Sequence, residues 1–181
     1  TNVFSNGPVL LKGNVSIDCL GTTMSAINKN GNVKIARLET NAAHRPLPTP
    51  DWDALREVTT LRAETQLNGS LTLADVRFAG SLTISGNLKI SGLLVVEGDL
   101  TISGNLNLTK VAIFCRGELR ISGNAGITGL VYAGRGLKMS GNPNIEGAIA
   151  VNGKAEIAGS VGNTDVPVEQ YACWLKPEED F

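Results

Sequence analysis

Aromatic residues are scarce in this 181-residue sequence, whereas glycine is abundant. The chain contains four phenylalanines, two tyrosines and two tryptophans against 21 glycines. Most globular cores draw much of their volume from aromatic rings, so this composition predicts a narrow interior filled by Leu, Ile and Val. With 42% hydrophobic and 18% charged residues, the chain falls outside the disordered class.

An excess of charge of one sign is also missing. The net charge is -1 and the pI is about 5.8, so the sequence gives no strong signal for nucleic-acid binding. No apolar run approaches the roughly 18 residues needed to cross a bilayer. The sequence begins at Thr1 without a methionine, which predicts a removed leader or anchor, or an excised fragment. Any membrane contact would then pass through a missing amino-terminal helix.

Cysteine and histidine are too few for a disulfide framework or a zinc site. Cys19, Cys115 and Cys173 have no CxxC spacing, and the single histidine, His44, lies in a proline-bearing stretch without ligands at suitable spacing. We expect Cys115 to be a buried thiol. Cys19 and Cys173 can pair if the protein is exported, and the sequence leaves that disulfide open. We predict no metal and no cofactor.

The clearest signal in the sequence is a repeat of about 18 residues. The stretch GSLTISGNLKI, residues 80–90, returns as GDLTISGNLNL at 98–108, and weaker copies follow. The aligned residues are Leu82, Leu100, Leu119, Leu137 and Ala155, with spacings of 18, 19, 18 and 18. Within each repeat apolar residues alternate, as in the pair Leu82 and Ile84, and alternation is the period of a strand.

This repeat predicts an all-β fold, a single-stranded triangular β-solenoid of about 18 residues per coil. Three short strands would form each coil, with a glycine able to take positive φ at the turns. The inward aliphatic residues would then form vertical columns. Asn87, Asn105, Asn124 and Asn142 recur at one turn and predict an asparagine ladder. The handedness of the coil stays open.

The same register divides the chain into segments. KGNVSI near the start is matched 18 residues later by NGNVKI, so we expect residues 1–38 to form the first coils. Residues 39–66 form an insertion with a proline-rich loop and a short helix capped by Asp51. Residues 67–163 form the main solenoid, and residues 164–181 a carboxyl-terminal cap.

One side of the expected coil is apolar on its outer surface. A strand that is apolar on both surfaces is normally covered on both, so this face predicts an interface. The cover comes from the chain itself, through the helix near Trp52 and Leu55 or the tail, or else from a protein partner or a second copy. The candidate interaction face consists of Leu93, Val95, Ala112, Phe114, Leu130, Tyr132 and Trp174.

The search for chemistry leads to a non-enzymatic interpretation. Asp99 and Glu118 occupy adjacent outward positions, with Arg120 diagonal to Glu118, and we interpret them as a solvated charge cluster. The alternative is the acid–base pair of a carbohydrate-active β-helix enzyme. G-x-S-x-G and a P-loop are both absent. We therefore predict that the protein is not an enzyme.

The stretches GDLTISGN, GLVYAGRGLKMSGNPNIEGAIAVNGKAEIAG and PTPDWDALRE resemble the β-solenoid ectodomains of PilX-type pilus assembly proteins, which are pilin-like components. The resemblance implies an exported, cell-surface module that acts in filament assembly, adhesion or tip contact with pilin partners. It supplies no catalytic residues. Bactofilin-like proteins share the six-residue rhythm, which leaves a second hypothesis: a cytoplasmic filament that polymerises through open solenoid ends.

Overall fold

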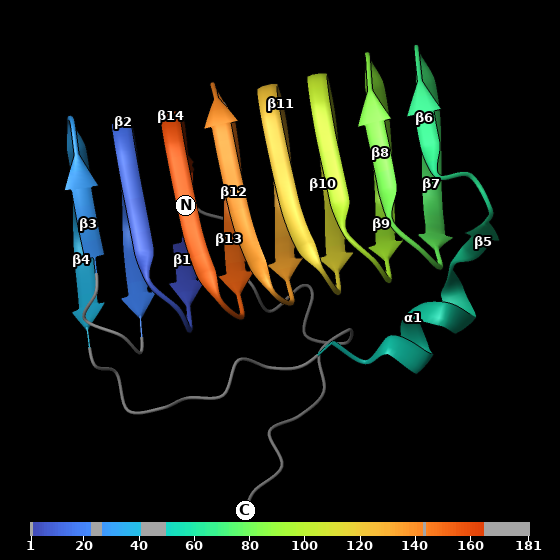
Figure 1. Ribbon diagram of the computed structural model, residues 1–181, viewed down its shortest axis with the longest axis horizontal. Coiled ribbons are helices and arrows are strands. Elements are labelled where there is room, and N and C mark those ends of the chain that lie inside the picture. The colour runs from blue at the N-terminus through green and yellow to red at the C-terminus, as the bar shows by residue number, and fades with distance from the viewer. Residues whose placement is uncertain (1, 23–26, 41–49, 143, 165–181) are drawn as a thin grey trace, which may run out of the picture.

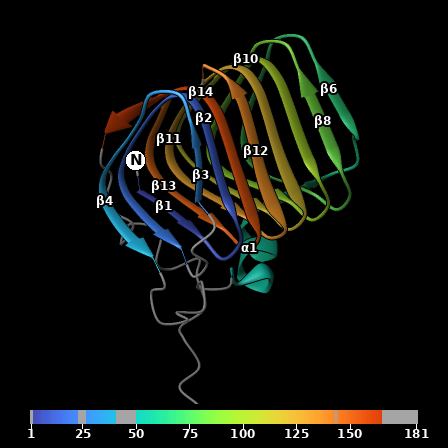
Figure 2. The ribbon, with the colours of Figure 1, turned by 60° about the vertical axis from the view of Figure 1, so that its left-hand side comes forward.

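The computed structural model describes residues 2–22, 27–40, 50–142 and 144–164. The predicted fold class is confirmed. The strands pair in parallel into one 14-stranded sheet that winds around a single axis, with about 18 residues per coil, as Figures 1 and 2 show. One short helix, α1, lies outside the coil.

The elements follow one another in this order: β1 (Asn2–Ser5), β2 (Val9–Thr22), β3 (Ile27–Asn30), β4 (Val33–Thr40), α1 (Trp52–Val58), β5 (Thr60–Arg62), β6 (Gln66–Asn68), β7 (Leu71–Phe78), β8 (Leu82–Ser85), β9 (Leu88–Val96), β10 (Leu100–Cys115), β11 (Glu118–Ala133), β12 (Gly136–Gly141), β13 (Asn144–Val151) and β14 (Lys154–Thr164). The long strands β10 and β11 bend around the corners of the triangle, so one element can serve more than one face.

Each coil has three faces, which β10 illustrates. Residues 100–103 lie on the first face, where β10 pairs with β8. Residues 106–108 lie on the second face and residues 112–115 on the third, and on both of these β10 pairs with β9. The first and second faces meet at the Ser–Gly–Asn turn, here Ser103 to Asn105.

The predicted core columns are confirmed. Leu100 pairs with Leu82 on one side and with Leu119 on the other, and the stack continues through Leu137 to Ala155. All five are at most 2% exposed. Burying a large aliphatic side chain stabilises the fold by roughly 1.5 to 3 kcal/mol, so the repeated leucine supplies the same contribution in coil after coil.

A column of glycines explains why Ser–Gly–Asn recurs. Gly104 has a φ of 115°, in the left-handed region that favours glycine, and a Cβ there would lie 2.7 Å from the carbonyl oxygen of Gly86. Glycine is therefore required at this turn for two reasons, the positive φ and the close approach of the neighbouring turn. In stacking order the column is Gly69, Gly86, Gly104, Gly123, Gly141, Gly159, Gly13 and Gly31, all with positive φ.

The order of the coils along the rod differs from the order along the chain. Val9 of β2 pairs with Ala155 of β14, so residues from the start of the chain stack on the end of the main solenoid. Val3 of β1 pairs with Ile149 of β13, so β1 completes the third face of the coil that β14 begins. In Figure 1 the blue strands accordingly lie beside the orange ones.

The insertion between β4 and α1 thus joins two distant parts of the rod. β4 lies at one end in Figure 1, whereas α1 and β5 lie near the other end. The sequence left open whether this segment runs along the rod or folds over one end. Residues 1–38, 39–66, 67–163 and 164–181 stay predictions as domain bounds, and the last of these ranges lies almost wholly outside the described residues.

Candidate functional site

Helix α1 covers part of the apolar outer surface of the third face. The predicted cap is confirmed: the Asp51 side chain accepts a hydrogen bond from the N–H of Ala54 at 3.3 Å. Leu55 is fully buried and packs in one cluster with the third-face residues Leu93, Val95, Ala112, Phe114, Leu130, Tyr132 and Ala148. Each of these is at most 8% exposed. The cover over this patch comes from within the chain.

Three contacts, made by Trp52 and Arg56, also hold α1 to the solenoid. The Trp52 ring meets Tyr132 edge-on, with 6.4 Å between ring centroids, and the Arg116 guanidinium lies 4.7 Å over Trp52. Arg56 donates to both carboxylate oxygens of Glu97, at 2.8 and 3.2 Å. The Glu97 carboxylate also accepts from Arg77 of β7, and its bonds to Arg56 lower the pKa of Glu97.

The candidate interaction face is therefore covered in part by α1, through Leu55 and Trp52. Contact of these residues with a partner or with a second copy stays a prediction, and where Leu55 packs it would require α1 to leave the third face. Trp174 and His44 lie outside the described residues. Cys173 does as well, so the pairing of Cys19 with Cys173 stays a prediction.

Cys115 is fully buried on the inner side of the third face. Its Sγ donates weakly to the carbonyl oxygens of Gly98, at 3.4 Å, and Glu118, at 3.7 Å. Burial raises the pKa of the thiol to about 11. The sequence prediction of a buried thiol is confirmed, and a thiol in this state is a poor nucleophile.

The charge cluster on the first face has structural contacts. Asp99 Oδ1 accepts the backbone N–H of Glu118 in the next coil at 2.8 Å, and the Asp99 N–H donates to Ser81 Oγ at 3.0 Å. The Glu118 carboxylate accepts two hydrogen bonds from Arg120, at 3.1 and 3.2 Å. Asp99 thus joins successive coils, and Glu118 is held in a two-bond ion pair.

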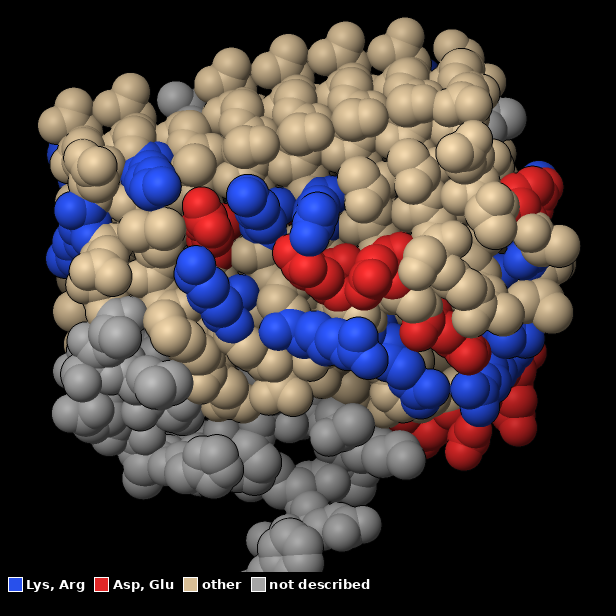
Figure 3. All heavy atoms as spheres, in the orientation of Figure 1, with Lys and Arg blue, Asp and Glu red and all other residues tan. Residues whose placement is uncertain are grey.

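A groove of about 430 Å³ adjoins this cluster. We call it the charged groove, and its lining residues are Asp99, Glu118, Arg120, Arg135, Gly136, Leu137, Lys138, Lys154 and Glu156. Figure 3 shows acidic and basic side chains gathered across the lower half of the first face. The sequence analysis missed this groove, although the aligned repeats place Gly136 where neighbouring coils carry Glu118 and Lys154.

The upper margin of the same face is uncharged over the central coils. It consists of four identical Ser–Gly–Asn turns, residues 85–87, 103–105, 122–124 and 140–142, which we call the Ser–Gly–Asn band. The predicted asparagine ladder is confirmed in part of the band. Asn124 donates to Asn105 at 3.3 Å and Asn142 donates to Asn124 at 3.4 Å.

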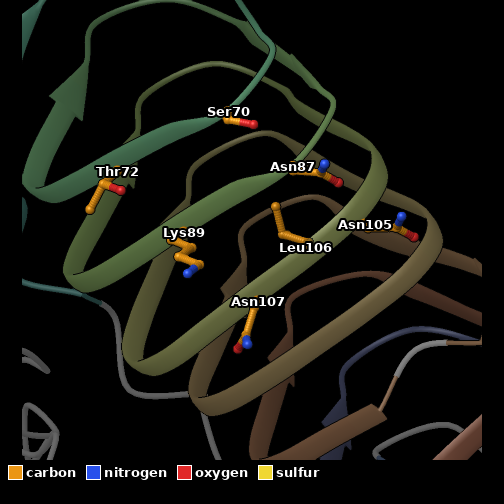
Figure 4. Close-up of a pocket in the computed structure, with 7 residues that line it drawn as sticks. All are labelled: Ser70, Thr72, Asn87, Lys89, Asn105, Leu106 and Asn107. Atoms are coloured by element: carbon orange, nitrogen blue, oxygen red, sulfur yellow. The ribbon is translucent and has the colours of Figure 1, made fainter.

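A shallow depression of about 460 Å³ runs beside the band on the second face. Figure 4 shows Asn87 and Asn105 at its upper edge, with Thr72, Lys89 and Asn107 along the strands below them. Amide and hydroxyl groups at its edge offer hydrogen-bond donors and acceptors, while most of its lining surface is apolar and includes Leu106.

The described residues contain neither a membrane-spanning helix nor a metal-binding cluster. No helix among them is long and apolar enough to span a membrane. No group of three or more His, Cys, Asp or Glu side chains in the same part of the chain is arranged to hold a metal ion.

Comparison with solved structures finds a similar fold in the DUF3494 domain of an ice-binding protein from Shewanella frigidimarina. The TM-score is 0.63 at 13% identity, and the match covers 91% of this chain and 93% of that chain. At this identity the likeness shows a shared fold alone. The model of a family described as a domain of unknown function (DUF8470) matches residues 106–160. No curated protein matches the chain.

These comparisons correct the resemblance drawn from the sequence. The likeness to PilX-type heads, and the more distant one to bactofilin-like solenoids, is wrong, because the matches are an ice-binding domain and a family of unknown function. The aliphatic and glycine rhythm that suggested it follows from the narrow core and the closely stacked glycine turns of this coil. Such a rhythm identifies the fold and not the family. The pilin partners and pilus role that it implied are withdrawn.

Proposed function

We propose that this protein is a non-catalytic binding module that holds a periodic ligand on the Ser–Gly–Asn band, and that the ligand is ice. The observation that carries the proposal is the four identical, uncharged turns stacked in register. Successive coils lie about 4.8 Å apart, so each hydroxyl and amide repeats at a fixed interval along the rod. The surface of an ice crystal also places its hydrogen-bonding water molecules at a fixed interval.

The side chains of the band are held in place before any ligand arrives. The ladder bonds from Asn124 to Asn105 and from Asn142 to Asn124 orient the amides. Ser103 Oγ and Ser122 Oγ donate to carbonyl oxygens of the preceding coil, both at 3.4 Å. Less conformational entropy is then lost when the band meets an ordered layer of water.

The distribution of charge favours the Ser–Gly–Asn band, and not the rest of the first face, as the ice-binding surface. Charged side chains hold their own strongly oriented hydration shells, which do not fit an ice lattice. The lower half of the first face carries Asp99, Glu118, Arg120 and Lys138, whereas the four turns above carry none (Figure 3). The fold shared with a domain named for ice binding supports the same choice of ligand.

We also propose that the protein is exported, because it must leave the cell to contact extracellular ice. An extracellular location also agrees with the sequence expectation that the protein is exported. Fractionation of the source cells, with detection by an antibody against the solenoid, would test this. Recovery in the cytoplasmic fraction alone would contradict export.

Ice-affinity capture of the full chain tests the proposed function. We expect the wild type to become enriched in a slowly growing ice phase and to slow recrystallisation of polycrystalline ice. Asn105→Lys places a hydrated cation in the middle of the band and should reduce the enrichment at least severalfold. If the wild type is not enriched above an inert protein of similar size, the proposal fails.

Asn152→Lys is the matched control. Asn152 is exposed at a different corner of the coil and also takes part in an asparagine pair, with Asn6 as donor at 3.0 Å. The two variants therefore add the same charge, and each removes one side-chain pair. Equal loss of ice enrichment in both would show that the band has no special role.

A further inference from the structure

The charged groove is separate from the Ser–Gly–Asn band, and one missing side chain creates its hollow. Gly136 lies in register between Glu118 of the preceding coil and Lys154 of the next. Its φ lies outside the left-handed region. A Cβ there would lie 3.3 Å from the Lys154 carbonyl oxygen and 4.0 Å from Glu118 Cγ. Gly136 lacks the positive φ of the turn column, but a Cβ there would approach the Lys154 carbonyl closely, so glycine both avoids this contact and leaves space beside Glu118.

Basic side chains without carboxylate partners border this space. Among the described residues, Arg135 and Lys138 form no ion pair. Both are exposed. Lys154 approaches Glu156 at 3.7 Å with its side chain 59% exposed, so it too can turn to a ligand. The hollow over Gly136 therefore combines space with three cations within one groove.

Carboxylates alternate with these cations and restrict what the groove can accept. Glu118 lies on one side of the hollow and Glu156 on the other, with Asp99 one coil further along. The backbone of DNA carries a charge on every unit and no hydroxyl group, so it would place anionic oxygens near these carboxylates without any donor to them. A ligand whose units each carry an anionic group together with hydroxyls fits better, because the hydroxyls can donate hydrogen bonds to the carboxylates.

From this arrangement we propose that the charged groove binds an acidic polysaccharide built of uronic acid units. A uronate carboxylate lies over Gly136 and accepts from Arg135 and Lys138, as guanidinium and ammonium groups favour. Sugar hydroxyls on either side donate to Glu118 and Glu156. The residues that line the groove come from several successive coils of the first face, so a linear polymer can lie along it. The site is independent of ice binding and would hold the module on an acidic polymer surface.

Titration of the full chain with oligogalacturonate tests this site, using calorimetry at low and at physiological ionic strength. We expect saturable binding that weakens as salt is added, because exposed charges are screened. Neutral dextran of equal length should not bind. Arg135→Gln and Lys138→Gln should each weaken oligogalacturonate binding by roughly tenfold, the value of a hydrogen bond between charged groups. Gly136→Gln fills the hollow and should abolish binding.

Lys89→Gln is the control, because Lys89 is an exposed lysine on the second face. It should leave the oligogalacturonate affinity unchanged. Thermal unfolding followed by circular dichroism shows whether each variant folds, and the two exposed substitutions keep the test decisive if Gly136→Gln does not. No binding by the wild type would overturn the proposal. Equal loss in Lys89→Gln, or equally tight binding of single-stranded DNA, would also overturn it.

Discussion

Val9 of β2 is the parallel partner of Ala155 of β14, so the first coils of the chain continue the stack where the main solenoid ends. The coil at this joint is shared, since β14 supplies its first two faces and β1 supplies the third. Ser5 faces inward there, and its hydroxyl donates to the carbonyl oxygens of Gly153, at 2.8 Å, and Gly7, at 3.1 Å. The two parts of the rod are therefore joined by core packing as well as by strand pairing.

Substitution of Val3 tests the joint. Val3 is 3% exposed, and Val3→Asp would place a carboxylate in the core, which should lower the free energy of unfolding by more than about 2 kcal/mol. Val58→Asp is the control, because Val58 is 49% exposed. Urea unfolding followed by circular dichroism measures both. An equally small effect of the two changes would show that β1 does not complete the coil.

The glycine column predicts a sharp contrast within the main solenoid. Gly104→Ala combines a positive φ with a close approach to Gly86, and we expect a loss of stability of about 2 kcal/mol or more. Gly126→Ala, in the next coil, meets nothing nearer than 3.8 Å and should be close to neutral. Melting temperatures of the two variants give the comparison. Similar values for both would contradict the requirement for glycine at the turn.

Leu55 predicts how firmly α1 covers the third face. Leu55→Ala should lower the free energy of unfolding by roughly 2 to 5 kcal/mol, because the side chain is fully buried in the cluster. Trp52 fluorescence, read in a Trp174→Phe background, should shift to longer wavelength as the ring leaves Tyr132. Leu61→Ala is the control, since Leu61 is 54% exposed. An unchanged Trp52 spectrum together with unchanged stability would mean that Leu55 does not hold α1 in place.

Glu97 predicts a loss of stability in acid. Arg56 lowers the pKa of Glu97 in the folded state below the unfolded value of roughly 4.3. The stabilisation is therefore fully present above the unfolded pKa and is lost as the pH falls through the folded pKa. We expect the wild type to be more stable than Glu97→Gln at pH 7, with the difference shrinking in acid. Urea unfolding across the pH range checks this, with Glu57→Gln as a control on the exposed side of α1. A difference that does not depend on pH would contradict this role of Glu97.

Cys115 predicts slow thiol chemistry. With its pKa raised to about 11, the thiol carries little thiolate at pH 8, and burial blocks access to reagents. In a background of Cys19→Ser and Cys173→Ser, labelling by a thiol reagent should be slow in buffer and complete in denaturant. Rapid labelling of the folded protein would contradict the buried position.

The sequence by itself determined the repeating coil of this protein. An aliphatic pair at alternate positions, a glycine with positive φ and an asparagine at a fixed place in each repeat define a coil, and Leu82, Gly86 and Asn87 already contain that information. These requirements are local, because each coil meets its neighbours through the same few positions. The capped helix at Asp51 was predictable for the same reason.

Only the tertiary structure decided how the units are ordered. The open edges of different coils carry the same alternation of apolar residues, so the sequence does not show that Val9 stacks on Ala155. The position of α1 over Phe114 and the hollow at Gly136 depend on this arrangement in space. Both arise between segments or coils that lie apart in the chain, and a local pattern cannot specify which distant surfaces meet.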